Sequence, residues 1–169
     1  DADVYKFLRY FTFLPLDEIQ AIEAVDAAAA GRPQAQAVLA SEATSLVHGE
    51  EGLNAALRIT EALFSGSSVD LSESDLKQLS QDGMPFSQLS NSDLVDKPLT
   101  NLLTDAGMVK AGREVKDALA RNSVFINGIA KGSQDNMGAS NSFTAEHGLY
   151  ERFFLVRLGK KKYHLFELI

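Results

Sequence analysis

Several cations lie close together in the stretch from Leu99 to Gly128. Arg113 and Lys116 are three residues apart in a segment with helical periodicity, and Lys110 stands just before it. Residues three apart occupy neighbouring positions on one helix face, so both side chains could reach adjacent phosphates of a nucleic acid. Arg121 extends the set at the end of the segment. The alternative is a charged helix face that contacts only water, which is the commoner role of such runs.

A second group of cations is the tight turn Gly159-Lys160-Lys161-Lys162, which joins two apolar runs, with Arg157 shortly before it. Lysines at a hairpin tip can bind a phosphate backbone without burial of their charge. Such contacts supply affinity and orientation, whereas sequence is read through contacts to bases. The alternative is a charged turn that protects edge strands from aggregation.

Patterns typical of catalysis or metal binding are missing from the sequence. It contains no cysteine, no glycine-rich phosphate loop and no pair of histidines at metal-ligand spacing. His48, His147 and His164 form no triad-like arrangement with a nucleophile. We therefore predict no catalytic residue and no metal site in this chain. His48 precedes Gly49 at a predicted helix end, and we interpret it as a capping residue.

Length and composition indicate two small domains rather than one large one. The chain has 169 residues, of which 45% are apolar, enough to bury real cores. No apolar run approaches the roughly 18 residues of a membrane span, and residues 1–30 lack the features of a signal peptide. Together with the absence of cysteine, this predicts a soluble cytoplasmic protein.

The net charge of −7 argues against a nucleic-acid partner, but the charge is distributed unevenly. Residues 1–84 carry five basic and fourteen acidic side chains, a balance of −9. Residues 85–169 carry eleven basic and nine acidic side chains, a balance of +2. From Lys97 onward eleven basic residues face seven acidic ones, a balance of +4. The second half is therefore the candidate for an anionic partner.

The first half is predicted to be a bundle of four helices with short connections. Apolar residues recur at helical spacing in each helix, and the breaks fall at Pro15, Gly31, Gly49 and Gly66. We expect the fourth helix to bury a face that consists of Leu53, Ala56, Leu57, Thr60 and Phe64. Several phenylalanines could stack on bases, but periodicity assigns most of them to cores: Phe7, Phe11, Phe13, Phe64, Phe153 and Phe154.

A stretch rich in serine, aspartate and glycine separates the two halves. Ser72 and Asp75 resemble a capping box that opens a short helix, and Phe86 to Leu89 is predicted to be a strand. We place the domain boundary near Gly66, with an alternative near Gly83. The predicted organisation is a helical domain over 1–66, a junction over 67–97 and a second domain over 98–169.

The second domain is predicted to be an α+β unit with a small antiparallel sheet. A helix opens after Pro98, and a second helix runs from about Gly112 to Arg121. Val124 to Ile126 then leads into Asn127-Gly128, the strongest short hairpin signal. After a polar loop over residues 131–142, two further strands are expected over 152–158 and 163–169.

Ten residues of this region together resemble the RNA-binding module named after ribosomal small-subunit protein S-four. They are Leu99, Leu102, Ala106, Gly107, Arg113, Val115, Ala118, Val124, Asn127 and Gly128. The module usually has a glycine just before its strand, where this chain has Asn122-Ser123. Because the module occurs in several classes of protein, the flanking sequences must distinguish among them.

The flanks resemble the C-terminal half of bacterial tyrosyl-tRNA synthetase, in order and spacing. The matching segments are DADVYKFLRYFTFLPLDEI, LVHGEEGLNAALRITEALFSG and RFFLVRLGKKKYHLFEL. The HIGH-type and KMSKS-type signatures of that family's catalytic domain are absent from this sequence. The resemblance therefore implies a piece of a longer protein, in which an upstream Rossmann domain uses ATP, with magnesium, to ligate tyrosine to its tRNA.

The resemblance also implies partners and site residues. The expected partner is tyrosine tRNA, bound through its long variable arm and anticodon stem by Lys110, Arg113, Lys116, Arg121, Arg157, Lys160, Lys161 and Lys162. The helical half is then an anticodon-binding domain, and Asp1 and Asp3 are candidates for contact with a base edge, with helix capping as the alternative. The full-length protein is expected to dimerise through its catalytic domain, and this chain to be a monomer.

Two other functions remain open at this point. A stand-alone RNA-binding regulator would use the same module without any synthetase. A protein-interaction or structural role for the helical half, with nonspecific RNA binding by the basic half, is the second alternative.

Overall fold

The computed structural model describes residues 3–65, 71–81 and 83–169 of the chain. Contacts divide the chain into two compact units, Asp1–Leu57 and Arg58–Ile169, which we call unit 1 and unit 2 and describe separately. The division falls within a helix, because residues after Leu57 pack on unit 2. The boundary predicted at Gly66 lies outside the described residues, so the predicted domain limits stay predictions.

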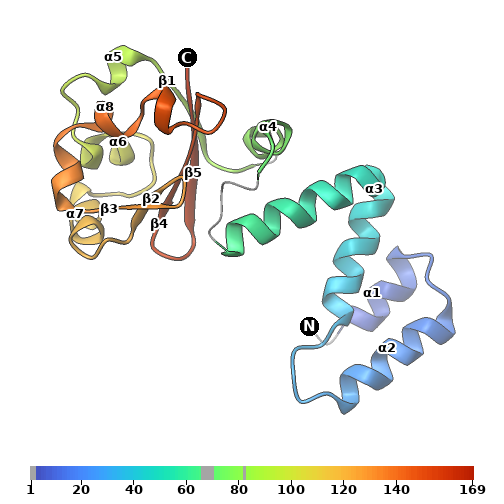
Figure 1. The fold of residues 1–169 in the computed structure, drawn as a ribbon. Helices are drawn as coiled ribbons and strands as arrows, with labels where there is room; N and C mark the ends of the chain where they lie inside the picture. Colours follow the sequence, from blue (N-terminus) through green and yellow to red (C-terminus); the bar gives the residue numbers. More distant parts are fainter. Residues whose placement is uncertain (1–2, 66–70, 82) are drawn as a thin grey trace. The chain divides into compact units, whose positions relative to one another are not determined.

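Unit 1 consists of helices packed around a small core. Its elements are α1 (Val4–Phe11), α2 (Leu16–Ala28) and the first part of α3 (Ala35–Ser65) (Figure 1). Leu8 and Ile19 are fully buried at the centre of this core. Asp26 at the end of α2 accepts hydrogen bonds from the backbone N–H groups of Gln34 (2.8 Å) and Ala35 (3.0 Å) and from the Tyr5 hydroxyl (3.0 Å). One carboxylate therefore caps α3 and links it to α1 and α2.

The break predicted at Gly49 is a kink inside α3. Gly49 has φ +71° and ψ 178°, a conformation essentially restricted to glycine, and helix continues on both sides of it. The third and fourth predicted helices are thus two segments of α3. His48 is exposed on the first segment, and a Cβ at Gly52 would lie 2.5 Å from the His48 Cβ. Glycine is therefore required at both positions for this kink.

The prediction of which helix face is buried in residues 50–65 is wrong. Leu57 is 52% exposed and Phe64 is 87% exposed. Ala62 is buried instead, and Ile59 and Leu63 pack beside it on a core of unit 2. The helix has apolar residues on more than one face, so the tertiary partner decides which face is buried.

The prediction that most of the six phenylalanines are core residues holds only for Phe153 and Phe154, because Phe64 is exposed although it belongs to unit 2. Phe153 and Phe154 are buried in strand β4, whereas Phe7, Phe11 and Phe13 are exposed on and after α1. Helical spacing aligned Phe7 and Phe11 with Val4 and Leu8, but the core of unit 1 is too small to cover them all.

Unit 2 is built on one five-stranded sheet with the order β1-β5-β4-β2-β3. The strands are β1 (Phe86–Leu89), β2 (Val124–Ile126), β3 (Ile129–Lys131), β4 (Phe153–Leu158) and β5 (Lys162–Leu168). Neighbouring strands from β5 to β3 are antiparallel, as predicted, but β1 pairs with β5 in parallel. The α+β class is confirmed, while the sheet is mixed rather than wholly antiparallel.

Helices cover both faces of this sheet (Figure 1). The helices of unit 2 after α3 are α4 (Glu73–Gln81), α5 (Asn91–Leu94), α6 (Leu99–Asp105), α7 (Gly112–Ala120), η2 (Ser133–Met137), α8 (Ala139–Ser142) and η3 (Ala145–His147). One core lies between α6, α7 and the sheet face that carries Phe154, Val156 and Phe166. The other lies between α4, the end of α3 and the opposite face, with Leu155 and Leu165.

The predicted polar loop over 131–142 is in fact largely helical. It contains η2 and α8, and Ala139, Ser142 and Phe143 are buried. Asn136 accepts hydrogen bonds from the backbone N–H and the hydroxyl of Thr100, which attaches η2 to α6. These short turns have too few apolar residues for periodicity to reveal them.

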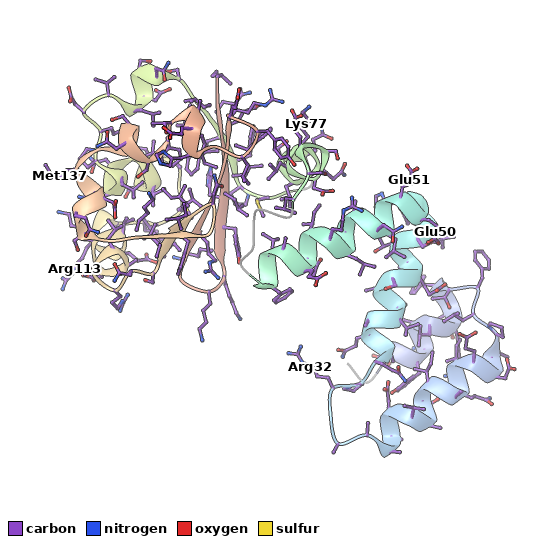
Figure 2. All side chains as sticks on the ribbon, in the orientation of Figure 1. Arg32, Glu50, Glu51, Lys77, Arg113 and Met137 are labelled. Carbon is purple, nitrogen blue, oxygen red and sulfur yellow. The ribbon has the colours of Figure 1, made fainter. Side chains whose placement is uncertain are left out.

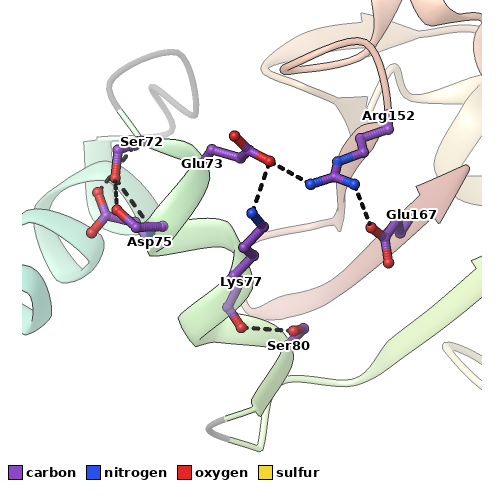
Figure 3. A network of polar contacts seen from close by, with 8 residues as sticks. Ser72, Glu73, Asp75, Lys77, Ser80, Arg152 and Glu167 are labelled. Carbon is purple, nitrogen blue, oxygen red and sulfur yellow. Dashed lines mark hydrogen bonds and ion pairs between the residues drawn. The ribbon is translucent and has the colours of Figure 1, made fainter.

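Helix α4 begins with the predicted capping box and is held to the sheet by charged residues (Figure 3). The Ser72 N–H donates to Asp75 Oδ2 (3.0 Å), and the Asp75 N–H donates to Ser72 Oγ (3.1 Å). Arg152 bridges Glu73 of α4 and Glu167 of β5. Burial raises the pKa of the Asp75 carboxyl, but Arg58 and Ser72 more than offset this effect and lower it overall.

Candidate nucleic-acid interface

Helix α7 separates an apolar face from a charged one. Val115, Ala118 and Leu119 are buried against the sheet, so Arg113 and Lys116 point outward. The Arg113 side chain is 91% exposed and lies 3.9 Å from Asp117 at its nearest ion-pair contact. Figure 2 labels Arg113 on α7. A contact this long and exposed leaves the guanidinium available to a phosphate.

Lys110 and Arg121 lie before and after this helix. Lys110 is exposed in the connection between α6 and α7, and Arg121 is exposed at the end of α7. Asn122 follows with φ +50°, a left-handed conformation that asparagine tolerates better than most residues. Asparagine thus replaces the glycine that the S-four module usually has before its strand.

The lysine turn between β4 and β5 is attached to both ends of α7. At one end, Lys162 Nζ lies 2.5 Å from Glu114 Oε1 in the first turn of α7. At the other, the Gly159 N–H donates to the Ser123 carbonyl (2.8 Å) just after α7. Lys160 and Lys161 remain exposed at the tip. Cations separated by more than forty residues in the sequence therefore belong to one surface, which we call the α7–turn surface.

Arg157 lies on the opposite face of the sheet from this surface. Side chains alternate along β4, so Val156 and Leu158 face the α7 side while Arg157 faces away. Its guanidinium carbon lies 4.1 Å from the centre of the Phe125 ring, a cation–π contact. Arg157 is therefore not grouped with the other predicted RNA-binding cations, because strand alternation directs it elsewhere.

The Asn127-Gly128 turn does more than connect β2 and β3. Both residues have positive φ, 48° and 81°, as expected for a two-residue hairpin turn. The buried Asn127 amide also donates to the carbonyls of His147 (2.9 Å) and Phe153 (3.2 Å), and its oxygen accepts from the Leu155 N–H (2.8 Å). The Asn-Gly pair predicts the turn but not this role of Asn127, which depends on residues far away in the chain.

The three histidines have separate environments. His164 is buried in β5, and desolvation lowers its pKa to about 4, so it is neutral at physiological pH. Its Nε2 lies 3.0 Å from Ser87 Oγ on β1. His147 contacts the Thr144 hydroxyl (2.6 Å), and His48 is exposed. Within the described parts of the chain, no group of metal-ligating side chains comes together.

The two aspartates predicted to contact a base edge lie at the start of the chain. Asp1 is outside the described residues. Asp3 occupies the position before α1, where its carbonyl accepts from the Phe7 N–H (3.0 Å), but its side chain makes no capping hydrogen bond. Asp3 therefore occupies the N-cap position of α1, but its carboxylate does not cap the helix.

In the described ranges, no helix is long and apolar enough to cross a membrane.

Comparison with known proteins assigns both parts of the chain to one group of enzymes. Residues 75–166 match the family model described as the tyrosine–tRNA ligase SYY-like C-terminal domain. Residues 1–65 match the model of class I tRNA synthetases for tryptophan and tyrosine. The two matches together cover most of the chain and leave only a short segment between them.

Curated relatives carry the same name. Tyrosine–tRNA ligase of Dechloromonas aromatica is 48% identical over 98% of this chain and 37% of that protein. Tyrosine–tRNA ligase 1 of Photorhabdus laumondii is 44% identical over 95% of this chain and 36% of that protein. A solution structure of a tyrosyl-tRNA synthetase C-terminal domain is 30% identical over 64% of this chain and all of its own length, with a TM-score of 0.44.

The chain spans little more than a third of the length of these curated relatives. The family model over residues 75–166 accounts for more than half of the chain. The chain therefore belongs to the family of tyrosine–tRNA ligase SYY-like C-terminal domains.

Proposed function

We propose that this chain is the tRNA-binding C-terminal part of a tyrosine–tRNA ligase. In this proposal it binds and orients tyrosine tRNA for ATP-dependent aminoacylation by a catalytic domain outside the chain. The family assignment and the names of the relatives support this function over a stand-alone regulator. Unit 2 would supply the main RNA-binding surface, and unit 1 would approach the anticodon.

The observation that carries the proposal is the continuity of the α7–turn surface. Arg113 and Lys116 are exposed on α7 and Lys110 is exposed just before it, while Lys160 and Lys161 form the tip of the turn that Glu114 and Ser123 hold beside α7. Exposed cations on a rigid helix and a tight turn suit successive phosphates of a double-stranded arm. The variable arm and the anticodon stem of the tRNA are the proposed targets.

Three properties of the whole protein belong to the same proposal. ATP, with magnesium, would bind to the catalytic domain, and no step in this chain depends on it. The full-length protein would be a cytoplasmic homodimer held together by that domain. The 169-residue chain would then be a monomer.

Binding to two tRNAs at several salt concentrations tests the proposal. The chain is expected to bind a tyrosine tRNA transcript more tightly than a tRNA with a short variable arm at physiological salt. Its affinity should fall linearly with salt on logarithmic axes, because bound phosphates release counterions. Equal affinity for both tRNAs would favour nonspecific binding, and no measurable binding of either would refute the proposal.

A further inference from the structure

A groove of about 450 Å³ lies in unit 2 beside the lysine turn, at a place where β5 extends past its neighbour. The pairing of β1 with β5 begins at Phe86 and Leu165, so no strand among the described residues pairs with the first residues of β5 on that side. The segment before β1, the connection between α6 and α7, and β5 line the groove, with Met84, Pro85, Met108, Lys161, Tyr163 and His164 among its residues.

Pro85 determines which backbone groups lie unpaired at the base of the groove. The Leu165 N–H donates to the Pro85 carbonyl (2.9 Å), so this N–H points towards β1. Backbone groups two residues apart in a strand point the same way, and the N–H and C=O of Tyr163 therefore face the groove. A further residue of β1 would donate to the Tyr163 carbonyl, but proline has no N–H. A backbone donor and an adjacent acceptor thus lie at an unpaired strand edge.

His164 adds a polar group to the inner wall. It is only 2% exposed and stacks on Phe166, with 4.3 Å between ring centres. Its Nε2 contacts Ser87, but its Nδ1 is buried and has no hydrogen-bond partner among the described residues. Buried polar atoms are nearly always satisfied, so this ring nitrogen is a group that could gain a hydrogen bond if a ligand or a water molecule reached it.

We propose that this groove binds one unstacked nucleotide of an RNA. The base would lie between the apolar side chains of Met84 and Met108, with its polar edge towards the Tyr163 backbone. The phosphate would lie at the rim, on Lys161 and Lys162, which also belong to the α7–turn surface. The volume is that of an ordinary small-ligand site, and a few polar groups within apolar walls are typical of such sites.

Continuity with the α7–turn surface identifies the occupant as part of an RNA chain. The proposal therefore rests on the proposed function. Where an unpaired nucleotide adjoins a double-stranded arm whose phosphates follow the lysine turn, its base would lie at the mouth of the groove. Single-stranded nucleotides are recognised in just this way, by cations along the backbone and apolar or aromatic contacts to splayed bases.

Two lysines of the same turn provide a matched pair of variants. Both Lys160 and Lys161 are exposed, but only Lys161 lines the groove. Lys161→Ala is expected to weaken tyrosine tRNA binding about tenfold, whereas Lys160→Ala should weaken it about twofold, as loss of a single exposed phosphate contact does. Equal losses for the two variants would mean that the turn contributes only general electrostatic attraction, and would overturn the proposal.

Backbone amide NMR spectra of the chain test occupancy directly. Ribonucleoside monophosphates, added separately, should shift the amides of Gly107, Met108 and Tyr163, and inorganic phosphate should shift only those of the lysine turn. Bound tyrosine tRNA should shift the same groove amides. Met108→Trp, which fills the groove, should abolish the nucleotide shifts while the rest of the spectrum shows an intact fold.

The outcomes separate this proposal from the function on which it rests. If the chain binds tyrosine tRNA with the expected salt dependence but no groove amide shifts, the groove proposal is wrong and the function stands. If inorganic phosphate reproduces the groove shifts, the site is an anion site and not a nucleotide site. If tyrosine tRNA does not bind at all, the proposed function itself fails.

Discussion

The two units of this chain bury their apolar residues to very different extents. Unit 2 has a core on each face of its sheet, and phenylalanines such as Phe154 and Phe166 are fully buried. Unit 1 has a core of a few residues around Leu8 and Ile19, while Phe11 and Phe13 remain exposed. A sheet with a core on each face therefore positions the α7–turn surface. The stability of unit 1 depends on a small core and one capping carboxylate.

Core truncations in each unit should have the largest effects and should reveal this difference. Leu8→Ala and Phe154→Ala each remove a fully buried side chain, and losses of about 2–5 kcal/mol are typical. We expect Leu8→Ala to unfold unit 1 and leave the amide protection of unit 2 unchanged. Phe154→Ala should lower the stability of unit 2 but leave it folded. Hydrogen exchange monitored by NMR measures both, and equal loss of protection in both units after Leu8→Ala would contradict the comparison.

Asn127 tests whether polar contacts contribute to the stability of unit 2. Asn127→Gly removes three side-chain hydrogen bonds and leaves the buried Leu155 N–H without its acceptor, which costs about 1–3 kcal/mol. Asn127→Ala should cost more, because alanine disfavours φ +48°. Urea unfolding of both variants gives the difference. If alanine were the milder replacement, the left-handed backbone would not matter at this turn.

The kink at Gly49 should be the next most sensitive feature of unit 1. Gly49→Ala places a side chain in a backbone region essentially restricted to glycine and should cost about 1–3 kcal/mol. Gly31→Ala is the matched control, because a Cβ added at Gly31 would meet no atom within 4 Å and this glycine needs no positive φ. Thermal unfolding followed by circular dichroism should show a loss only for the Gly49 variant. Similar curves for both would mean that α3 straightens without cost.

Acid should destabilise unit 1 through Asp26. Burial raises the pKa of this carboxyl, but hydrogen bonds from Gln34, Ala35 and Tyr5 outweigh that effect and lower the pKa below its usual 3.8. The stabilisation is therefore present above pH 3.8 and is lost as the pH falls through the lower, folded-state value. Asp26→Asn should weaken this acid dependence, and Asp17→Asn on the exposed start of α2 should not. A wild-type acid profile in Asp26→Asn would assign the effect to another group.

Arg157 should have the smallest effect and distinguishes the two faces of the sheet. Arg157→Ala loses a cation–π contact with Phe125, and a loss of about 0.5–1 kcal/mol of stability is expected. Because Arg157 faces away from α7, the salt dependence of tRNA binding should stay close to that of the unaltered chain. If Arg157→Ala reduced the salt dependence of tRNA binding as much as Arg113→Ala does, the opposite face of the sheet would belong to the RNA-binding surface.

Local sequence signals predicted much of unit 2. The capping box at Ser72 and Asp75, the strand at Phe86, the helix–turn–helix–strand from Leu99 and the Asn127-Gly128 turn are all present in the structure. Each depends on residues close in sequence, so spacing alone was sufficient. The conformation of Asn122 also explains how this chain departs from the usual glycine of the module.

The failures share a different cause. The buried face at the end of α3, around Ala62, depends on contacts within unit 2, and the burial of Ser142 and Phe143 depends on short turns that pack on the sheet. RNA binding by Arg157 stays a prediction, but only the tertiary structure shows that strand alternation places this residue on the face that α7 does not cover. The groove at Pro85 and His164 likewise forms only when β1 and β5 pair.

The most direct test of RNA binding by the α7–turn surface is the salt dependence of tyrosine tRNA affinity in Arg113→Ala/Lys116→Ala. Both side chains are exposed, so the variant should fold normally. If both cations contact phosphates, the logarithmic slope should decrease in magnitude by about 2, one for each lost contact. An unchanged slope and affinity would contradict the assignment of this surface to RNA.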